Sequence, residues 1–330
     1  MKTILLQIDP IKPSSSAIAQ AARIIQSGGL VAFPTETVYG LGGNGLDASC
    51  ASRIYAAKGR PSDNPLILHI ATWQQLTDLV LEIPESAYIL GRHFWPGPLT
   101  MVLKKRPHVP DATTGNKPTV AVRMPDHAVA LELIRAAGCP LAAPSANLSG
   151  KPSPTTAEHV VEDLNEIIPC ILDGGPTRIG LESTVIDLSG PEPVILRPGG
   201  ISLEEILAVL PTARLAGADD DRSSSPGTKY RHYAPKAKVL IVERKLAQTE
   251  RLKYRQQGHK VGWIGESAPP ETQHLLFPND AQFYARYYFA ALRDLDQQGA
   301  DLIIVERIDE TGLGAAVMDR IRRSAGYVSA

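Results

Sequence analysis

Residues 215–238 have no periodic apolar pattern, and they divide this chain of 330 residues into two parts. Their sequence, LAGADDDRSSSPGTKYRHYAPKAK, is rich in Asp, Ser, Pro and Gly, which is typical of a segment that links domains. A single hydrophobic core usually stops growing at about 250 to 300 residues, so the length also favours two domains. We therefore predict a first domain over residues 1–212, a linker over 213–237 and a second domain over 238–330.

On both sides of the linker, short apolar strands alternate with amphipathic helices, which indicates α/β folds. In the first part we expect helices near 13–27, 48–57, 72–80, 85–94, 128–137 and 156–164, and strands near 30–34, 66–70, 100–103, 119–125, 140–144, 170–173, 183–188 and 194–197. In the second part we expect strands near 239–243, 260–265, 274–278 and 301–305, and helices near 280–298 and 314–323. This alternation predicts a small Rossmann-like α/β domain with a parallel sheet.

Two glycine motifs suggest nucleotide-binding loops, and we reject both interpretations. The segment Gly40–Gly45, GLGGNG, has the GxGxxG spacing, but FPTETVY separates it from the preceding strand, whereas the dinucleotide fingerprint needs its glycines directly after the strand. We expect a tight turn there instead, before a helix that Asp47 caps. The GK pair at 150–151 fails the P-loop pattern because positions 145 and 152 are Ser and Pro.

The segment KGRPSDNPLILHI, residues 58–70, is the strongest candidate for an anion site. Lys58 and Arg60 are expected to project from a turn, and two prolines stiffen the chain before the short strand that leads to His69. Two cations on a rigid turn suit a phosphate group. A solvated loop with incidental charges is the alternative.

Composition and motifs exclude several classes of function. The 34 basic and 35 acidic side chains leave a formal charge of -1, so no global field favours nucleic acid or a membrane surface. The chain lacks a GxSxG elbow, an HExxH motif and kinase motifs, and neither Glu36 nor Glu182 is singled out as a catalytic carboxylate. The three cysteines form no CxxC pair, and we find neither a signal peptide nor an apolar run long enough to span a membrane, so we expect a cytoplasmic protein.

Seven segments together resemble one known family: GGLVAFPTETVYGLG, KGRPSDNPLILHI, FWPGPLT, VAVRMP, PLAAPSANLSGKPSPT, LESTVIDL and ILRPGGIS. They resemble the YrdC-like family, the threonylcarbamoyl-AMP synthases, over about residues 10–210. The segment SPGTKYRHYAP and the α/β tail resemble the long form of that family. The resemblance implies a twisted mixed sheet in the first domain and a nucleotidyltransferase activity. The family makes threonylcarbamoyl-AMP and pyrophosphate from L-threonine, bicarbonate or carbon dioxide, and ATP.

The resemblance also implies a set of site residues and partners. Its nucleotide motifs correspond to Lys58, Arg60, Ser145 and Asn147, and further ATP contacts correspond to Asn64, Thr119, Ser153, Arg197 and the linker residue Tyr230. Its threonine pocket corresponds to Thr35, His69, Arg123, Ala143 and Ser183. Magnesium would accompany ATP, and no organic cofactor is implied. The product would pass to the transferase that modifies an adenosine beside the anticodon of certain tRNAs.

Two alternatives remain at this point. Similar domains occur in a larger carbamoyltransferase that makes carbamoyl-adenylate, but that protein carries zinc-binding CxxC motifs, which this chain lacks. A factor that binds RNA without catalysis is the other alternative, and the net charge of -1 argues against it. Weak RNA binding stays open.

Overall fold

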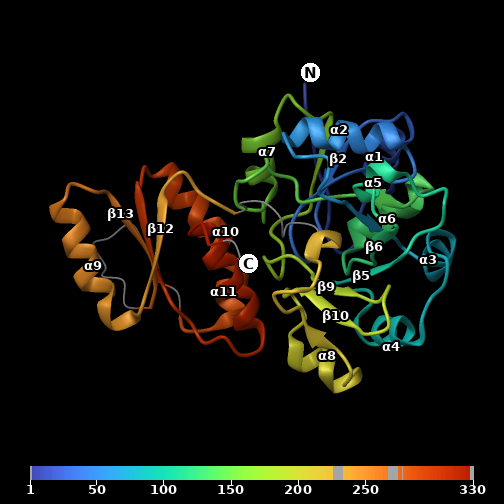
Figure 1. The fold of residues 1–330 in the computed structure, drawn as a ribbon. Coiled ribbons are helices and arrows are strands. Elements are labelled where there is room, and N and C mark those ends of the chain that lie inside the picture. Colours follow the sequence, from blue (N-terminus) through green and yellow to red (C-terminus); the bar gives the residue numbers. More distant parts are fainter. Residues whose placement is uncertain (1, 226–232, 267–273, 277, 328–330) are drawn as a thin grey trace.

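The computed structural model describes residues 2–225, 233–266, 274–276 and 278–327 (Figure 1). In this part of the chain, the first domain is built on an eleven-stranded mixed sheet of order β1-β8-β2-β3-β7-β4-β6-β5-β9-β10-β11. The second domain has a four-stranded parallel sheet of order β12-β15-β13-β14. The prediction of a mixed sheet followed by a small parallel α/β domain is confirmed.

The strands of the first sheet are short, from two to six residues each. They are β1 Ile4–Gln7, β2 Val31–Phe33, β3 Gly40–Asn44, β4 Ile67–His69, β5 Leu99–Lys104, β6 Thr119–Arg123, β7 Leu141–Ala142, β8 Cys170–Asp173, β9 Thr184–Asp187, β10 Val194–Arg197 and β11 Arg214–Leu215. The second sheet contains β12 Lys238–Val242, β13 Val261–Gly265, β14 His274–Leu276 and β15 Leu302–Glu306.

Helices cover both faces of the first sheet and form three layers with it. They are α1 Ser15–Gln26, α2 Ala48–Lys58, α3 Trp73–Leu79, α4 Glu85–Phe94, α5 Asp111–Thr114, α6 Ala128–Ala137, α7 Ala157–Leu164 and α8 Leu203–Val209, with a short 3-10 turn at Arg222–Ser224. The helices α1 and α6 share one core with β2 and β8. The larger core on the other face includes apolar side chains of α2, α3, α4, α7 and α8.

The second domain contains α9 Arg244–Gln256, α10 Ala281–Gln297 and α11 Leu313–Ser324. Figure 1 shows α10 and α11 on the side of the small sheet that faces the first domain, and α9 on the opposite side. Leu181 of the first domain packs into the core of the second. Among the described residues, no helix is both long and apolar enough to cross a bilayer.

The prediction of a tight turn at Gly40–Gly45 is wrong, because residues 40–44 form β3, a buried strand antiparallel to β2. Its glycines are required by close packing. A Cβ atom on Gly43 would lie 2.2 Å from Cys50 Sγ, and one on Gly42 would lie 2.5 Å from Phe33 Cε1. These glycines allow α2 and the Phe33 ring to approach the strand.

The first sheet also continues past the predicted end of the first domain at residue 212. Strand β11 pairs in parallel with β10 through Val194 with Arg214 and Ile195 with Leu215. Asp47 caps α2 as predicted, because its side chain accepts a hydrogen bond from the backbone N–H of Ser49.

Candidate active site

A single pocket collects most of the side chains that the sequence singled out, at the ends of strands from different parts of the chain. It contains about 650 Å³ of space, part of it open to solvent. Ile67 and His69 point into it from β4, whereas Leu68 between them points into the core, as strand alternation requires. The other lining residues are Thr35, Thr37, Val38, Gly40, Arg60, Pro65, Arg123, Ala143, Pro144, Ser145, Asn147, Glu182, Ser183, Arg197 and Tyr233.

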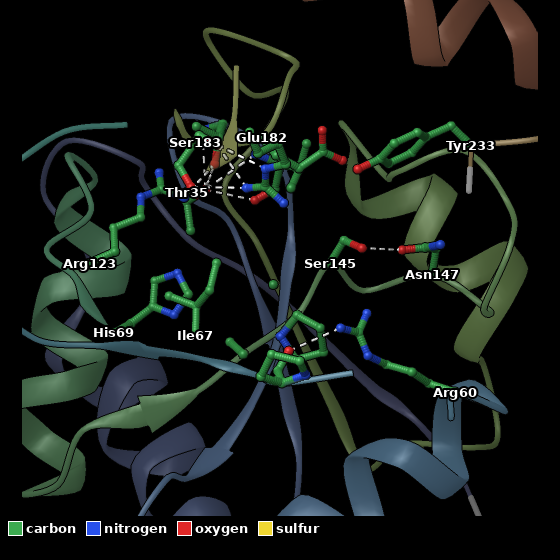
Figure 2. A pocket seen from close by; sticks show the side chains of 17 residues that line it. Thr35, Arg60, Ile67, His69, Arg123, Ser145, Asn147, Glu182, Ser183 and Tyr233 are labelled. Carbon is green, nitrogen blue, oxygen red and sulfur yellow. Dashed lines mark hydrogen bonds between the residues drawn. The ribbon is translucent and has the colours of Figure 1, made fainter. Parts of the chain in front are cut away.

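The pocket has two chemically different sides. Figure 2 shows Arg123 and His69 on one side, and Arg60 and Asn147 on the other. His69 and Arg123 are paired residues of the parallel strands β4 and β6, which explains why their side chains lie together. All five residues predicted for threonine line this pocket.

The Arg123 side chain is buried and held by three groups of the protein. Its Nη2 lies 2.7 Å from Glu36 Oε2, its Nη1 donates to Thr37 Oγ1 at 2.9 Å, and its Nε donates to the Gly97 carbonyl at 3.2 Å. A guanidinium has five N–H groups, so these contacts fix its position and leave donors for a ligand carboxylate.

The neighbouring His69 is neutral at physiological pH. Burial, together with the positive charge of Arg123, lowers the pKa of His69 to about 3. A neutral imidazole adds no second positive charge beside Arg123. Its Nδ1 atom is buried and makes no hydrogen bond within the described part of the chain.

The opposite side of the pocket carries cations and small polar groups. Burial lowers the pKa of Arg60 on this side to about 10, and it lowers the pKa of Arg197, which lies beside Ser183, to about 10 as well, so both remain charged at neutral pH. Ser145 Oγ donates to Asn147 Oδ1 at 2.5 Å, and Arg60 Nη2 donates to the Pro65 carbonyl at 3.1 Å. These groups can neutralise and position an anion such as a phosphate.

Lys58 does not project from a turn, because it is the last residue of α2 and is buried. Its Nζ donates to the carbonyls of Ser145 at 2.6 Å and Asn147 at 2.5 Å. Burial, followed by repulsion from Arg60, lowers the pKa of Lys58 well below its usual value. In this structure Lys58 therefore fixes the loop that carries Ser145 and Asn147.

Three other predicted ATP contacts are not among the residues that line the pocket. Asn64 is buried, and its carbonyl accepts from the Tyr55 hydroxyl at 3.1 Å. Thr119 is half-buried beside Ser224, and Ser153 donates to Glu182 Oε1 at 2.5 Å. Tyr230 lies outside the described residues.

Sequence reasoning did not assign to the site Glu36, which pairs with Arg123, or the lining residues Glu182 and Tyr233. Glu36 balances the charge of Arg123, and Tyr233 contributes an aromatic wall from the end of the linker. Burial acts to raise the pKa of Glu182, but Arg320 and Arg197 outweigh burial and hold it below its usual value. The one available signal was the position of both glutamates within segments that the resemblance had already marked.

Comparisons with known proteins decide the family. A family model described as "Telomere recombination" matches residues 23–199, and one described as "Threonylcarbamoyl-AMP synthase, C-terminal domain" matches residues 201–326. The threonylcarbamoyl-AMP synthase of Pyrococcus abyssi is 52% identical over 317 residues, which cover 93% of each chain. This chain belongs to the threonylcarbamoyl-AMP synthase family.

Solved and curated family members also account for the two-domain architecture. The crystal structure of P. abyssi Sua5 complexed with L-threonine matches with a TM-score of 0.94 at 50% identity and covers 98% of each chain. The threonylcarbamoyl-AMP synthase of Pseudomonas putida is 34% identical over 186 residues, which are 99% of its length but 56% of this chain. Family members thus occur with and without a counterpart of the second domain. Because P. abyssi relatives match both domains, the larger carbamoyltransferase is set aside.

Proposed function

We propose that this chain catalyses the family reaction, in which L-threonine, bicarbonate or carbon dioxide, and ATP give threonylcarbamoyl-AMP and pyrophosphate. The observation that carries this proposal is the division of one pocket into a side with Arg123 and His69 and a side with Arg60 and Asn147. The first side suits an amino acid, and the second suits a polyphosphate.

In this proposal the threonine carboxylate pairs with the remaining N–H groups of Arg123. Thr35, the neutral His69 and Ser183 offer hydrogen bonds to the other polar groups of threonine, and Ala143 contributes the neighbouring backbone. Glu36 and Thr37 keep the guanidinium in place while the substrate binds.

The chemistry needs no covalent enzyme intermediate. The neutral amine of threonine attacks carbon dioxide, a C–N bond forms and a proton leaves, which gives a carbamate. A carbamate oxygen then forms a bond to the α-phosphorus of ATP, and the bond from that phosphorus to the bridging oxygen of pyrophosphate breaks. Arg60 and Arg197 neutralise charge on the phosphates, and Lys58 orders the Ser145 and Asn147 loop.

Magnesium is part of the proposal as an ion that arrives on the ATP phosphates. Within the described residues, no group of three or more His, Cys, Asp or Glu side chains could hold a metal ion. Glu182 is the one carboxylate that lines the described pocket, and Ser153 and Arg320 already donate to it. These residues form no dedicated cage for the ion.

We further propose that the product passes to the threonylcarbamoyl transferase that modifies tRNA, in the cytoplasm. This step is a consequence of the reaction, because a mixed carbamic–phosphoric anhydride is a reactive acyl donor that requires an acceptor.

The test is to incubate the purified chain with ATP, magnesium and bicarbonate, with and without L-threonine. We expect release of pyrophosphate that depends on threonine, and a product with the mass of threonylcarbamoyl-AMP. Pyrophosphate release at the same rate without threonine would contradict the proposal. Salt-sensitive tRNA binding without ATP turnover would instead favour the RNA-binding alternative.

A further inference from the structure

The FWPGPLT segment, residues 94–100, contacts two residues of the threonine side of the pocket, Arg123 and Ser183. The Gly97 carbonyl accepts a hydrogen bond from Arg123 Nε at 3.2 Å. Three residues later, Thr100 Oγ1 lies 2.7 Å from Ser183 Oγ. Thr100 is fully buried in β5 and is not among the residues that line the pocket, whereas Ser183 is.

The strand pairing explains this contact. Strand β5 runs parallel to β9, with Leu99 opposite Thr184 and Thr100 opposite Val185. The Thr184 N–H donates to the Pro98 carbonyl at 2.9 Å, which fixes the start of β9 against the proline corner. Ser183, directly before β9, is thereby held beside Thr100.

The direction of the hydrogen bond determines which hydroxyl proton is left for a ligand. A fully buried hydroxyl proton without an acceptor is destabilising. Ser183 Oγ is the one acceptor recorded for the Thr100 hydroxyl within the described residues. The distance alone allows either hydroxyl to donate. With Thr100 as the donor, the proton left for a ligand belongs to Ser183, which lines the pocket, whereas with Ser183 as the donor it would belong to Thr100, which does not line it.

The Ser183 hydroxyl then accepts hydrogen bonds from two protein groups. Arg197 can only donate, and its Nη2 lies 3.3 Å from Ser183 Oγ while also donating to the Ser183 carbonyl at 2.8 Å. Thr100 and Arg197 together occupy the two lone pairs of the Ser183 hydroxyl. With Thr100 as the donor, the group that remains for a ligand is the Ser183 proton, because Ser183 lines the pocket.

We infer that Thr100 is a positioning residue that makes Ser183 a hydrogen-bond donor to an oxygen of the amino-acid substrate. Ser183 then recognises the carboxylate or the side-chain hydroxyl of threonine and cannot accept a hydrogen bond from its amine. This inference rests on the proposed function, because it takes the ligand of this side of the pocket to be L-threonine.

The first test is isothermal titration calorimetry of L-threonine with the full chain and its Thr100→Val and Thr100→Ser variants. Valine has nearly the shape of threonine but has no hydroxyl, so we expect about fivefold weaker binding, which is about 1 kcal/mol. The Thr100→Ser variant keeps the hydroxyl and should bind within about twofold of wild type. Equal affinity in all three proteins would overturn the inference.

A matched control separates positioning from general loss of packing. Thr113 is also fully buried, and its hydroxyl donates to the Gly45 carbonyl at 3.0 Å, but it does not line the pocket. Thr113→Val should leave threonine affinity unchanged. If it weakens threonine binding as much as Thr100→Val does, the effect of Thr100 is structural and the inference fails.

A double-mutant cycle tests whether Thr100 acts through Ser183. The Thr100→Val and Ser183→Ala changes should not add, so the double variant should bind threonine as weakly as Ser183→Ala alone. Additive effects would mean that Thr100 acts by another route. In turnover assays, Thr100→Val should raise the KM for threonine and leave the KM for ATP and kcat within about twofold.

The polarity of Ser183 can be tested with (R)-3-hydroxybutanoate, which keeps the carboxylate and hydroxyl of threonine but lacks its amine. If Ser183 donates to an oxygen, Ser183→Ala should weaken binding of this compound and of L-threonine by the same factor. If Ser183 instead accepts a hydrogen bond from the amine, Ser183→Ala should weaken binding of L-threonine but not of the compound without the amine. That result would overturn the inference.

These binding measurements are independent of turnover. Threonine binding without threonine-dependent pyrophosphate release would contradict the proposed function and leave the inference on Thr100 intact. Wild-type protein that does not bind L-threonine would overturn both.

Discussion

At the scale of single residues, the same burial leaves different charge states in the site, because its side chains start from different pKa values. Arg60 and Arg197 keep their charge despite burial, because the pKa of arginine starts far above neutral pH. His69 loses its charge in the same environment. The pocket thus combines permanent cations for anions with one neutral hydrogen-bonding ring.

The lowered pKa of His69 predicts a loss of stability in acid. Below pH 6.5 this histidine binds a proton in the unfolded chain, whereas in the folded chain it stays neutral down to its pKa of about 3. The free energy of unfolding therefore falls as the pH falls from 6.5 to about 3. At pH 5 the contribution is about 2 kcal/mol. In urea unfolding at pH 7.5 and pH 5, His69→Asn should therefore lose less stability than wild type. The exposed His93→Asn variant is the control and should lose as much stability as wild type. An equal loss of stability in His69→Asn and wild type would contradict this prediction.

The two hydrogen bonds of the buried Lys58 side chain predict a coupled loss of stability and nucleotide binding when it is replaced. Lys58→Met keeps the aliphatic chain but leaves the Ser145 and Asn147 carbonyls without their donor. Leaving a buried acceptor without its donor costs about 1–3 kcal/mol, so the free energy of unfolding should fall by about 3 kcal/mol for the two carbonyls. The KM for ATP should rise at least tenfold. The control is Lys104→Met, which removes an exposed ion pair with Glu82. If Lys58→Met keeps the wild-type free energy of unfolding and the wild-type KM for ATP, the prediction is wrong.

At the scale of elements, the sequence predicted those segments whose side chains show a clear period. Helices 85–94 and 128–137 and strands 170–173 and 194–197 agree with the structure to the residue. Strand β3 was missed because Leu41 is the one apolar residue in GLGGN apart from the glycines, so the segment shows no alternation of apolar and polar side chains. Its position depends on neighbours that are distant in sequence, such as Phe33 and Cys50, and a local pattern does not contain them.

The glycines of β3 predict a large cost for the smallest substitution. In Gly43→Ala the new methyl group would lie 2.2 Å from Cys50 Sγ in a fully packed core, so strand and helix must separate. We expect the free energy of unfolding to fall by about 2–3 kcal/mol in urea titrations. Gly190→Ala is the control, because a Cβ there meets no atom within 4 Å. Similar small effects of both changes would show that the core can relax around β3.

At the scale of the whole molecule, the sequence indicated two domains but not that the second holds Glu182, a residue that lines the pocket of the first. Arg320 of α11 is fully buried, and its Nε donates to Glu182 Oε2 at 2.7 Å while its Nη2 donates to the Pro198 carbonyl at 3.1 Å. Arg293 of α10 similarly donates to Asp163 Oδ2 at 2.8 Å. These partners lie more than 100 residues apart, so neither spacing nor composition could indicate them.

The Arg320–Glu182 pair predicts that the two domains depend on each other for stability. In Arg320→Met the Glu182 carboxylate would remain buried with Ser153 as its recorded donor, and breaking a buried ion pair typically costs about 3–5 kcal/mol. We expect a decrease of that size in the free energy of unfolding. The pKa of Glu182 should also rise, since Arg320 is the main group that lowers it.

Two comparisons make this prediction specific to the buried pair. Arg322 lies on the same helix but is 38% exposed in its ion pair with Glu310, so Arg322→Ala should cost less than about 1 kcal/mol. Adding Glu182→Gln to Arg320→Met removes the uncompensated charge and should restore part of the lost stability. If Arg320→Met costs no more than Arg322→Ala, the domains are held together by apolar contacts such as those of Leu181, and the charge on Glu182 is balanced within the first domain by Arg197.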